Sequence, residues 1–127
     1  MEKNKNRFFL DNIKRIVNAF FYSIAGLKAV FKKEASFRQE LILATILLPV
    51  AILVPLSYIE KILMISSLVI VLIIELLNSA IEAIVDRVSP ENHPLAKNAK
   101  DFGSAAVFLS LVNLCFIWCM CIINALI

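Results

Sequence analysis

Residues 75–87 read ELLNSAIEAIVDR, a run in which polar side chains interrupt the end of a strongly apolar segment. Positions spaced i, i+3, i+4, i+7 and i+11 share one face of an α-helix. Carboxylates are costly at membrane depth and, where they occur, usually face a bundle interior or a wet cavity. The run therefore predicts a membrane helix that carries a functional site on one polar stripe. The stripe consists of Glu75, Asn78, Ser79, Glu82 and Asp86.

The composition favours a membrane protein. Of the 127 residues 61% are hydrophobic, and the mean hydropathy is +0.85, which leaves too little polar surface for a water-soluble domain. Residues 41–59, 62–74 and 102–127 carry no charge. A bilayer core requires about 20 apolar residues per helix. We therefore expect an all-α membrane protein with transmembrane helices at about 36–57, 61–88 and 96–125.

Residues 1–33 predict a different kind of helix. Apolar residues recur mostly every three or four positions from Phe8 to Lys33, with basic residues between them. An amphipathic helix that is too polar to span the bilayer is expected to lie in the headgroup plane. The alternative, a packing helix of a soluble domain, has no downstream sequence to complete it. The whole chain, 1–127, is thus expected to form a single membrane domain.

The distribution of charge predicts an orientation. Residues 1–33 hold eight Lys or Arg against two acids, so the positive-inside rule places the N-terminus in the cytoplasm. Three spans then put residues 87–100 back in the cytoplasm and the C-terminus outside. A cleavable signal peptide is not expected, because the first 40 residues lack a compact apolar core with a small-residue cleavage site. Nucleic acid is not an expected partner, since no soluble basic domain is predicted.

Polar side chains cluster at the predicted cytoplasmic end of all three spans. Several carboxylates close together would repel one another unless cations bridge them. Hard divalent cations, which prefer oxygen ligands, fit that need better than zinc. The cysteines at 115, 119 and 121 lie without His or acid nearby, which favours simple packing over metal or redox chemistry. Besides the stripe, the cluster includes Glu34, Arg38, Gln39, Glu40, Lys97, Lys100, Asp101 and Ser104.

Carboxylates, basic residues and a lipid-facing location together suggest phosphoryl transfer from a nucleotide to a lipid hydroxyl. The chain has only two glycines, Gly26 and Gly103, so neither a Walker A loop nor a protein-kinase glycine loop can form. Metal ions and side chains would have to hold the phosphates instead. This is chemically sufficient, because phosphoryl transfer needs mainly positioning and charge neutralisation.

Three motifs in sequence order resemble the signatures of the small prokaryotic diacylglycerol kinase family. They are EASFRQE at 34–40, ExxNSAIEAxVDR at 75–87 and AKDxGSAA at 99–106, and the resemblance runs from about Arg15 to Trp118. It implies a surface helix plus three transmembrane helices, assembled as a homotrimer with composite sites between subunits. It also implies a bacterial cytoplasmic (inner) membrane, ATP as phosphoryl donor, Mg²⁺, and diacylglycerol as the substrate that becomes phosphatidic acid.

The resemblance also implies roles for individual residues. Glu75 matches the catalytic base that takes the proton from the lipid hydroxyl, and Glu34 and Glu82 match the Mg²⁺-binding carboxylates. Glu82 follows Glu75 by seven residues, so it is expected about 10 Å nearer the cytoplasm. Metal and nucleotide would then lie shallow, and the base would lie deeper beside the lipid.

Further positions are assigned by the same resemblance. The nucleotide-contacting positions are Tyr22, Glu34, Glu82, Glu91, Asn92, His93, Lys100 and Asp101. The lipid-site positions are Arg15, Glu75, Ser104 and Trp118, and the supporting positions on the polar stripe are Asn78 and Asp86. Three residues depart from the family pattern: Lys28 replaces an arginine, Leu53 a tryptophan and Pro94 a glutamate.

Two other functions stay open at this point. A sister activity within the superfamily phosphorylates undecaprenol with much the same catalytic motif, and acceptor choice depends on groove shape. A non-enzymatic helical subunit of a membrane complex would instead use buried acids to carry protons or ions. Single residues also have structural interpretations: Glu34 could stabilise a helix N-terminus, and Trp118 could be an interfacial belt residue.

Overall fold

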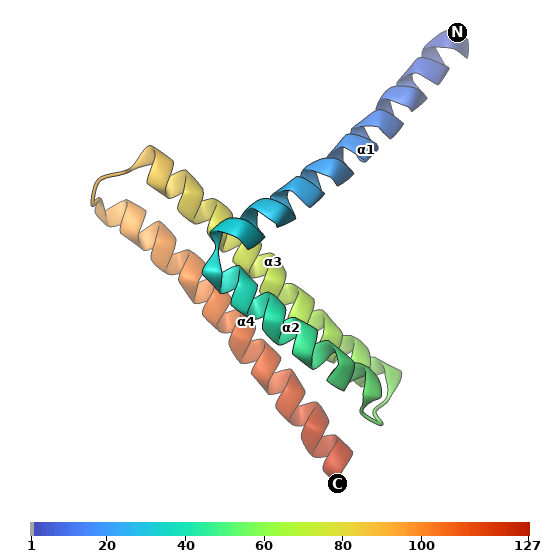
Figure 1. Ribbon diagram of the computed structural model, residues 1–127, viewed down its shortest axis with the longest axis vertical. Coiled ribbons are helices and arrows are strands. Elements are labelled where there is room, and N and C mark those ends of the chain that lie inside the picture. Colours follow the sequence, from blue (N-terminus) through green and yellow to red (C-terminus); the bar gives the residue numbers. More distant parts are fainter. Residues whose placement is uncertain (1) are drawn as a thin grey trace. The chain divides into compact units, whose positions relative to one another are not determined.

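The computed structural model describes residues 2–127, with side chains from residue 5 onward, and this part of the chain is helical throughout (Figure 1). Its four helices are α1 (Glu2–Lys33), α2 (Ala35–Leu53), α3 (Tyr58–Val88) and α4 (Pro94–Leu126). No strand occurs among the described residues. The prediction of an all-α protein is confirmed.

Two compact units make up the described chain. One is α1, a single continuous helix of 32 residues whose last turn holds Lys32 and Lys33, where positive charge favours the helix dipole. The other runs from Glu34 to Ile127 and contains α2, α3 and α4. Each of these three helices is long and apolar enough to cross a membrane, so the prediction of three helices of this kind is confirmed.

The ends of α2 and α3 differ from the predicted bounds because of local sequence signals. α2 ends at Leu53 rather than near residue 57, since Val54 precedes Pro55 and is extended, with φ −62° and ψ 136°. α3 begins at Tyr58 rather than 61 because Ser57 and Glu60 form a capping box. The Glu60 backbone N–H donates to Ser57 Oγ at 3.3 Å, and the Ser57 N–H donates to Glu60 Oε2 at 3.0 Å.

The packing of the second unit centres on α3, which contacts both α2 and α4. Its apolar core lies along the first half of α3, around the fully buried Met64. Trp118 of α4 joins this core, and its Nε1–H donates to Met64 O at 3.3 Å and to Ser67 Oγ at 3.2 Å. The buried cluster comprises Ala51, Met64, Leu68, Val71, Leu114, Trp118 and Cys121.

Hydrogen bonds join the three helices at the end of the bundle where α3 begins. Asn124 Nδ2 donates to Glu60 Oε1 at 2.7 Å and so ties the end of α4 to the start of α3. Lys61 Nζ donates to Ile52 O at 2.7 Å, which satisfies a carbonyl in the last turn of α2. This end is therefore fixed by hydrogen bonds within the chain.

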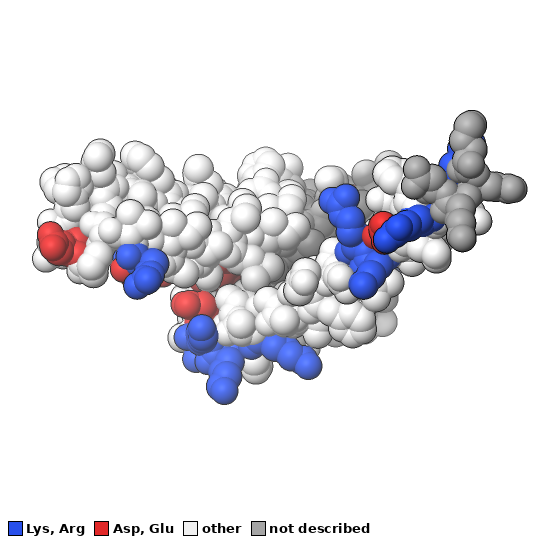
Figure 2. All heavy atoms as spheres, turned by 90° about the horizontal axis from the view of Figure 1, so that it is seen from above, with Lys and Arg blue, Asp and Glu red and all other residues white. Residues whose placement is uncertain are grey.

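Much of the outer surface of the three helices is apolar. Large side chains such as Ile73 and Leu77 of α3 and Phe108 of α4 are exposed, and most of the surface drawn in Figure 2 is uncharged. A water-soluble protein rarely exposes so much contiguous apolar surface. These faces are suited to contact with lipid or with another protein chain.

Candidate active site

Four carboxyl groups meet where the start of α2 lies beside the second half of α3. Glu75 interacts electrostatically with Glu82 on its own helix and with Glu34, which immediately precedes α2. Glu40, one turn into α2, also interacts with Glu75. α2 and α3 are joined by a short turn, so they run antiparallel, and this brings residues that are distant in sequence together. We call Glu34, Glu40, Glu75 and Glu82 the carboxylate group.

Glu75 is the deeply buried member of the carboxylate group. Only 4% of its surface is exposed, although it lies on a helix whose other faces carry exposed aliphatic side chains. The Ser36 side chain, on the first turn of α2, is a hydrogen-bond partner of its carboxyl group. Glu75 is therefore held between two helices, with one hydroxyl and three acids around it.

Asn78 lies one turn further along α3 and is also buried, with 8% of its surface exposed. Its Nδ2 donates to Glu82 Oε1 at 3.1 Å. Its Oδ1 is buried without a hydrogen-bond partner, and Glu40 Oε2 is in the same situation. Buried acceptors without a partner are uncommon and cost stability. Glu40 Oε2, which belongs to the carboxylate group, is therefore suited to accept from a hydrogen-bond donor or to bind a cation.

The carboxylate group fits a Mg²⁺ ion that takes only one or two of its ligands from the protein. Among the described residues, no three His, Cys, Asp or Glu side chains converge to hold a metal ion by themselves. Mg²⁺ at phosphoryl-transfer sites needs only one or two carboxylates, because water and substrate phosphates supply its other ligands. Glu34 and Glu82, which both interact with Glu75, offer that pair of hard oxygen donors.

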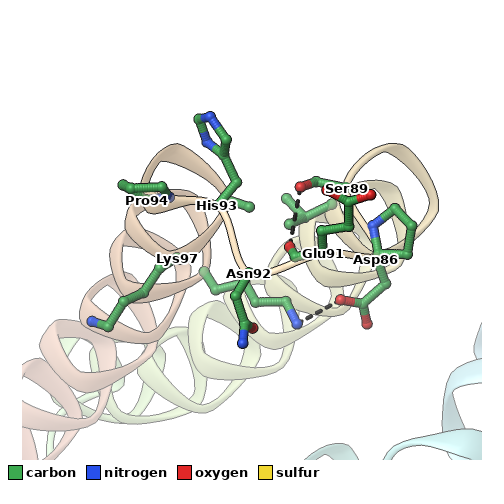
Figure 3. A pocket seen from close by; sticks show the side chains of 11 residues that line it. Asp86, Ser89, Glu91, Asn92, His93, Pro94 and Lys97 are labelled. Carbon is green, nitrogen blue, oxygen red and sulfur yellow. Dashed lines mark hydrogen bonds and ion pairs between the residues drawn. The ribbon is translucent and has the colours of Figure 1, made fainter.

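A pocket of about 500 Å³ opens between the end of α3 and the start of α4 (Figure 3). Lys100 Nζ forms an ion pair with Asp86 Oδ1 at 2.5 Å across these two helices, and Lys100 also interacts electrostatically with Glu82. The Lys100 side chain therefore connects the pocket to the carboxylate group. Predicted nucleotide positions that line the pocket are Glu91, Asn92, His93 and Lys100.

Two predicted nucleotide positions have local partners in the structure. His93 is the N-cap of α4: its Nδ1 accepts the Leu95 backbone N–H at 3.2 Å, and its ring points away from Asp86 in Figure 3. Asp101 does not line the pocket and pairs instead with Lys97 Nζ at 2.5 Å within α4. A capping role for His93 follows from its position just before Pro94, which occupies the first turn.

Two of the predicted lipid positions, Ser104 and Trp118, lie far apart on α4. Ser104 is exposed on α4, whereas Trp118 lies in the apolar core, roughly 21 Å further along the same helix. Arg15 and Tyr22 belong to α1, where they line a shallow hollow on that helix. A shared lipid site for Arg15, Glu75, Ser104 and Trp118 stays a prediction. The nucleotide contact expected of Tyr22 stays one as well.

Three residues of the site received no role from sequence: Ser36, Glu40 and Gly103. Glu40 was included in the predicted polar cluster, but without a function of its own. An antiparallel α2–α3 pair places the first turns of α2 beside the second half of α3, so Ser36 and Glu40 could have been found from topology. Gly103 could have been noticed as a glycine inside an apolar helix, opposite the polar stripe. A Cβ at Gly103 would clash with Asn78 Oδ1 and lie 3.2 Å from Asn78 Cγ.

Comparison with known proteins gives a consistent match. Residues 21–122 match the family described as prokaryotic diacylglycerol kinase. A diacylglycerol kinase from Pseudomonas aeruginosa is 53% identical over 106 residues, which cover 84% of this chain and 86% of that protein. The diacylglycerol kinases of Haemophilus influenzae and Escherichia coli K12 are 46% and 43% identical over 106 residues, covering 84% of this chain and 90% and 87% of theirs.

Proposed function

This chain belongs to the prokaryotic diacylglycerol kinase family and is a lipid kinase, and from that premise we propose that it uses MgATP to phosphorylate diacylglycerol. The products are phosphatidic acid and ADP. The observation that carries the proposal is the buried Glu75 carboxyl group, held beside Glu34 and Glu82 within a set of apolar helices. A base at that depth can meet the hydroxyl of a lipid whose acyl chains stay in the bilayer.

Glu75 acts as the general base. The lipid hydroxyl attacks the γ-phosphorus of ATP, the bond from that phosphorus to the β,γ-bridging oxygen breaks, and the hydroxyl proton passes to the Glu75 carboxylate. A general base must lie within hydrogen-bond reach of the proton that it takes. The contact from the Ser36 side chain supports this role, because it fixes the carboxyl group at one position between α2 and α3.

Glu34 and Glu82 would hold Mg²⁺ when MgATP binds. When bound, the metal neutralises phosphate charge that two carboxylates would otherwise repel. Asn78 keeps Glu82 in place through its 3.1 Å hydrogen bond, and Lys100 brings positive charge from the pocket side. The nucleotide occupies the pocket at the α3–α4 turn, where Asp86 holds the Lys100 side chain.

The assembly and its location follow from the same proposal. The protein spans the bacterial cytoplasmic membrane three times, with the N-terminus and the α3–α4 turn in the cytoplasm and the C-terminus outside. α1 lies in the headgroup plane. A homotrimer is supported by the exposed apolar faces of the helices. It is also supported by Glu34, Glu40 and Glu82, which are only partly buried within one chain, so a neighbouring chain would help to shield them from lipid.

The test is phosphorylation by the purified protein in mixed micelles, with diacylglycerol and undecaprenol offered side by side and with Mg²⁺ present or absent. Phosphatidic acid that forms only with Mg²⁺ and ATP is the expected result. A preference for undecaprenol would assign the protein to the sister activity, the phosphorylation of undecaprenol. Folded protein that transfers phosphate to neither lipid would favour a non-enzymatic subunit.

A further inference from the structure

Gly103 lies on the buried face of α4, directly beside Asn78 of α3. Its φ is not positive, so the backbone conformation itself does not require glycine. Space does: a Cβ at this position would clash with Asn78 Oδ1 and lie 3.9 Å from Asn78 Cα. The nearest atoms all belong to Asn78, so an added methyl group would have to displace the Asn78 amide.

The Asn78 amide is held in one orientation by what lies on its other side. A carboxylate oxygen accepts hydrogen bonds and does not donate, so Nδ2 must face Glu82 Oε1, and the amide oxygen then faces Gly103. That oxygen is buried and has no hydrogen-bond partner. The missing Cβ at Gly103 is therefore what leaves room for the amide to point toward Glu82.

We propose that Gly103 is a positioning residue for the metal-binding carboxylate: its lack of a side chain lets Asn78 hold Glu82 in place. The inference rests on the proposed function, in which Glu82 binds Mg²⁺. A side chain at residue 103 displaces the Asn78 amide and releases Glu82, while the residues that line the nucleotide pocket stay untouched. Partners that orient a metal ligand typically contribute about 10- to 100-fold to metal affinity.

The test compares Gly103→Ala with Gly26→Ala in the full-length protein. Gly26→Ala is the matched control, because a Cβ at Gly26 meets nothing within 4 Å. The dissociation constant for Mn²⁺ is measured by electron paramagnetic resonance without lipid. The Mg²⁺ concentration that gives half-maximal turnover is measured with lipid present. Gly103→Ala is expected to raise both values about tenfold, the low end of the range for such partners. Gly26→Ala leaves both within about twofold, because its added methyl group displaces no neighbour.

A purely structural role for Gly103 makes a different prediction in the double variant. Once Asn78→Ala has removed the amide, Gly103→Ala has nothing to displace, so the double variant should bind Mn²⁺ as Asn78→Ala alone does. Further loss in the double variant, its failure to fold, or unchanged Mn²⁺ binding in Gly103→Ala would overturn the inference. A wild-type protein without Mg²⁺-dependent transfer would contradict the proposed function instead.

Discussion

Both halves of α3 have α2 and α4 as neighbours, but they differ in whether their buried polar atoms have hydrogen-bond partners. In the first half, the buried Ser67 hydroxyl donates to Met64 O at 2.7 Å, and Trp118 Nε1–H donates to both residues. In the second half, Asn78 Oδ1 is buried without a partner, and Glu75 is surrounded by acids. In the first half these buried polar groups have hydrogen-bond partners within the chain, whereas in the second half a buried acceptor has none. The difference separates the part of the bundle that provides stability from the part to which we assign the chemistry.

This comparison predicts that a core substitution in the first half affects stability alone. Met64→Ala removes a fully buried side chain, which typically lowers the free energy of unfolding by about 2–5 kcal/mol. Leu63→Ala is the control, because that neighbouring side chain is 47% exposed and leaves no cavity. Unfolding is followed by detergent titration, and the KM for MgATP is measured on the folded fraction. A large change in that KM in Met64→Ala would show that the two halves are not separate.

A substitution in the second half is expected to affect the metal instead. Glu82→Gln removes one of the two proposed Mg²⁺ ligands and should raise the KM for MgATP about tenfold, equivalent to roughly 1.4 kcal/mol. Stability should change little, since Gln keeps the size of the side chain. Steady-state kinetics at varied MgATP provide the measurement. An unchanged KM, with a lower kcat, would assign Glu82 to the chemical step rather than to metal binding.

A smaller effect is expected at the N-terminus of α3. Ser57→Ala removes the capping box and should lower the free energy of unfolding by about 1 kcal/mol, with no effect on turnover. The check is a double-variant cycle with Glu60→Gln. If the two residues act as one cap, the second substitution adds less than its separate effect. Fully additive losses would contradict a shared cap.

The sequence was sufficient to predict the helices and to identify the end of the bundle at which the polar residues cluster. Uncharged segments predicted three spans, and the stripe on residues 75–87 identified the helix that carries Glu75. The end of α2 was placed too late, because the apolar run continues past Leu53 and hides the effect of Pro55 on Val54.

Contacts between helices were harder to predict. Trp118 near the middle of its span is compatible with a lipid-facing or a core-facing position, and only helix rotation distinguishes them. The structure turns it toward Met64 and Ser67. The approach of Gly103 to Asn78 depends on the distance between α3 and α4, which no spacing within either helix encodes.

The central claim is that the buried Glu75 carboxylate is the base, and turnover by Glu75→Gln tests it most directly. A general base contributes about 10²- to 10⁴-fold to rate, so kcat should fall by that factor while MgATP still protects the protein against unfolding. Glu60→Gln, the same change at the other end of α3, should retain turnover. Near-normal kcat in folded Glu75→Gln would contradict the claim and assign Glu75 a structural role.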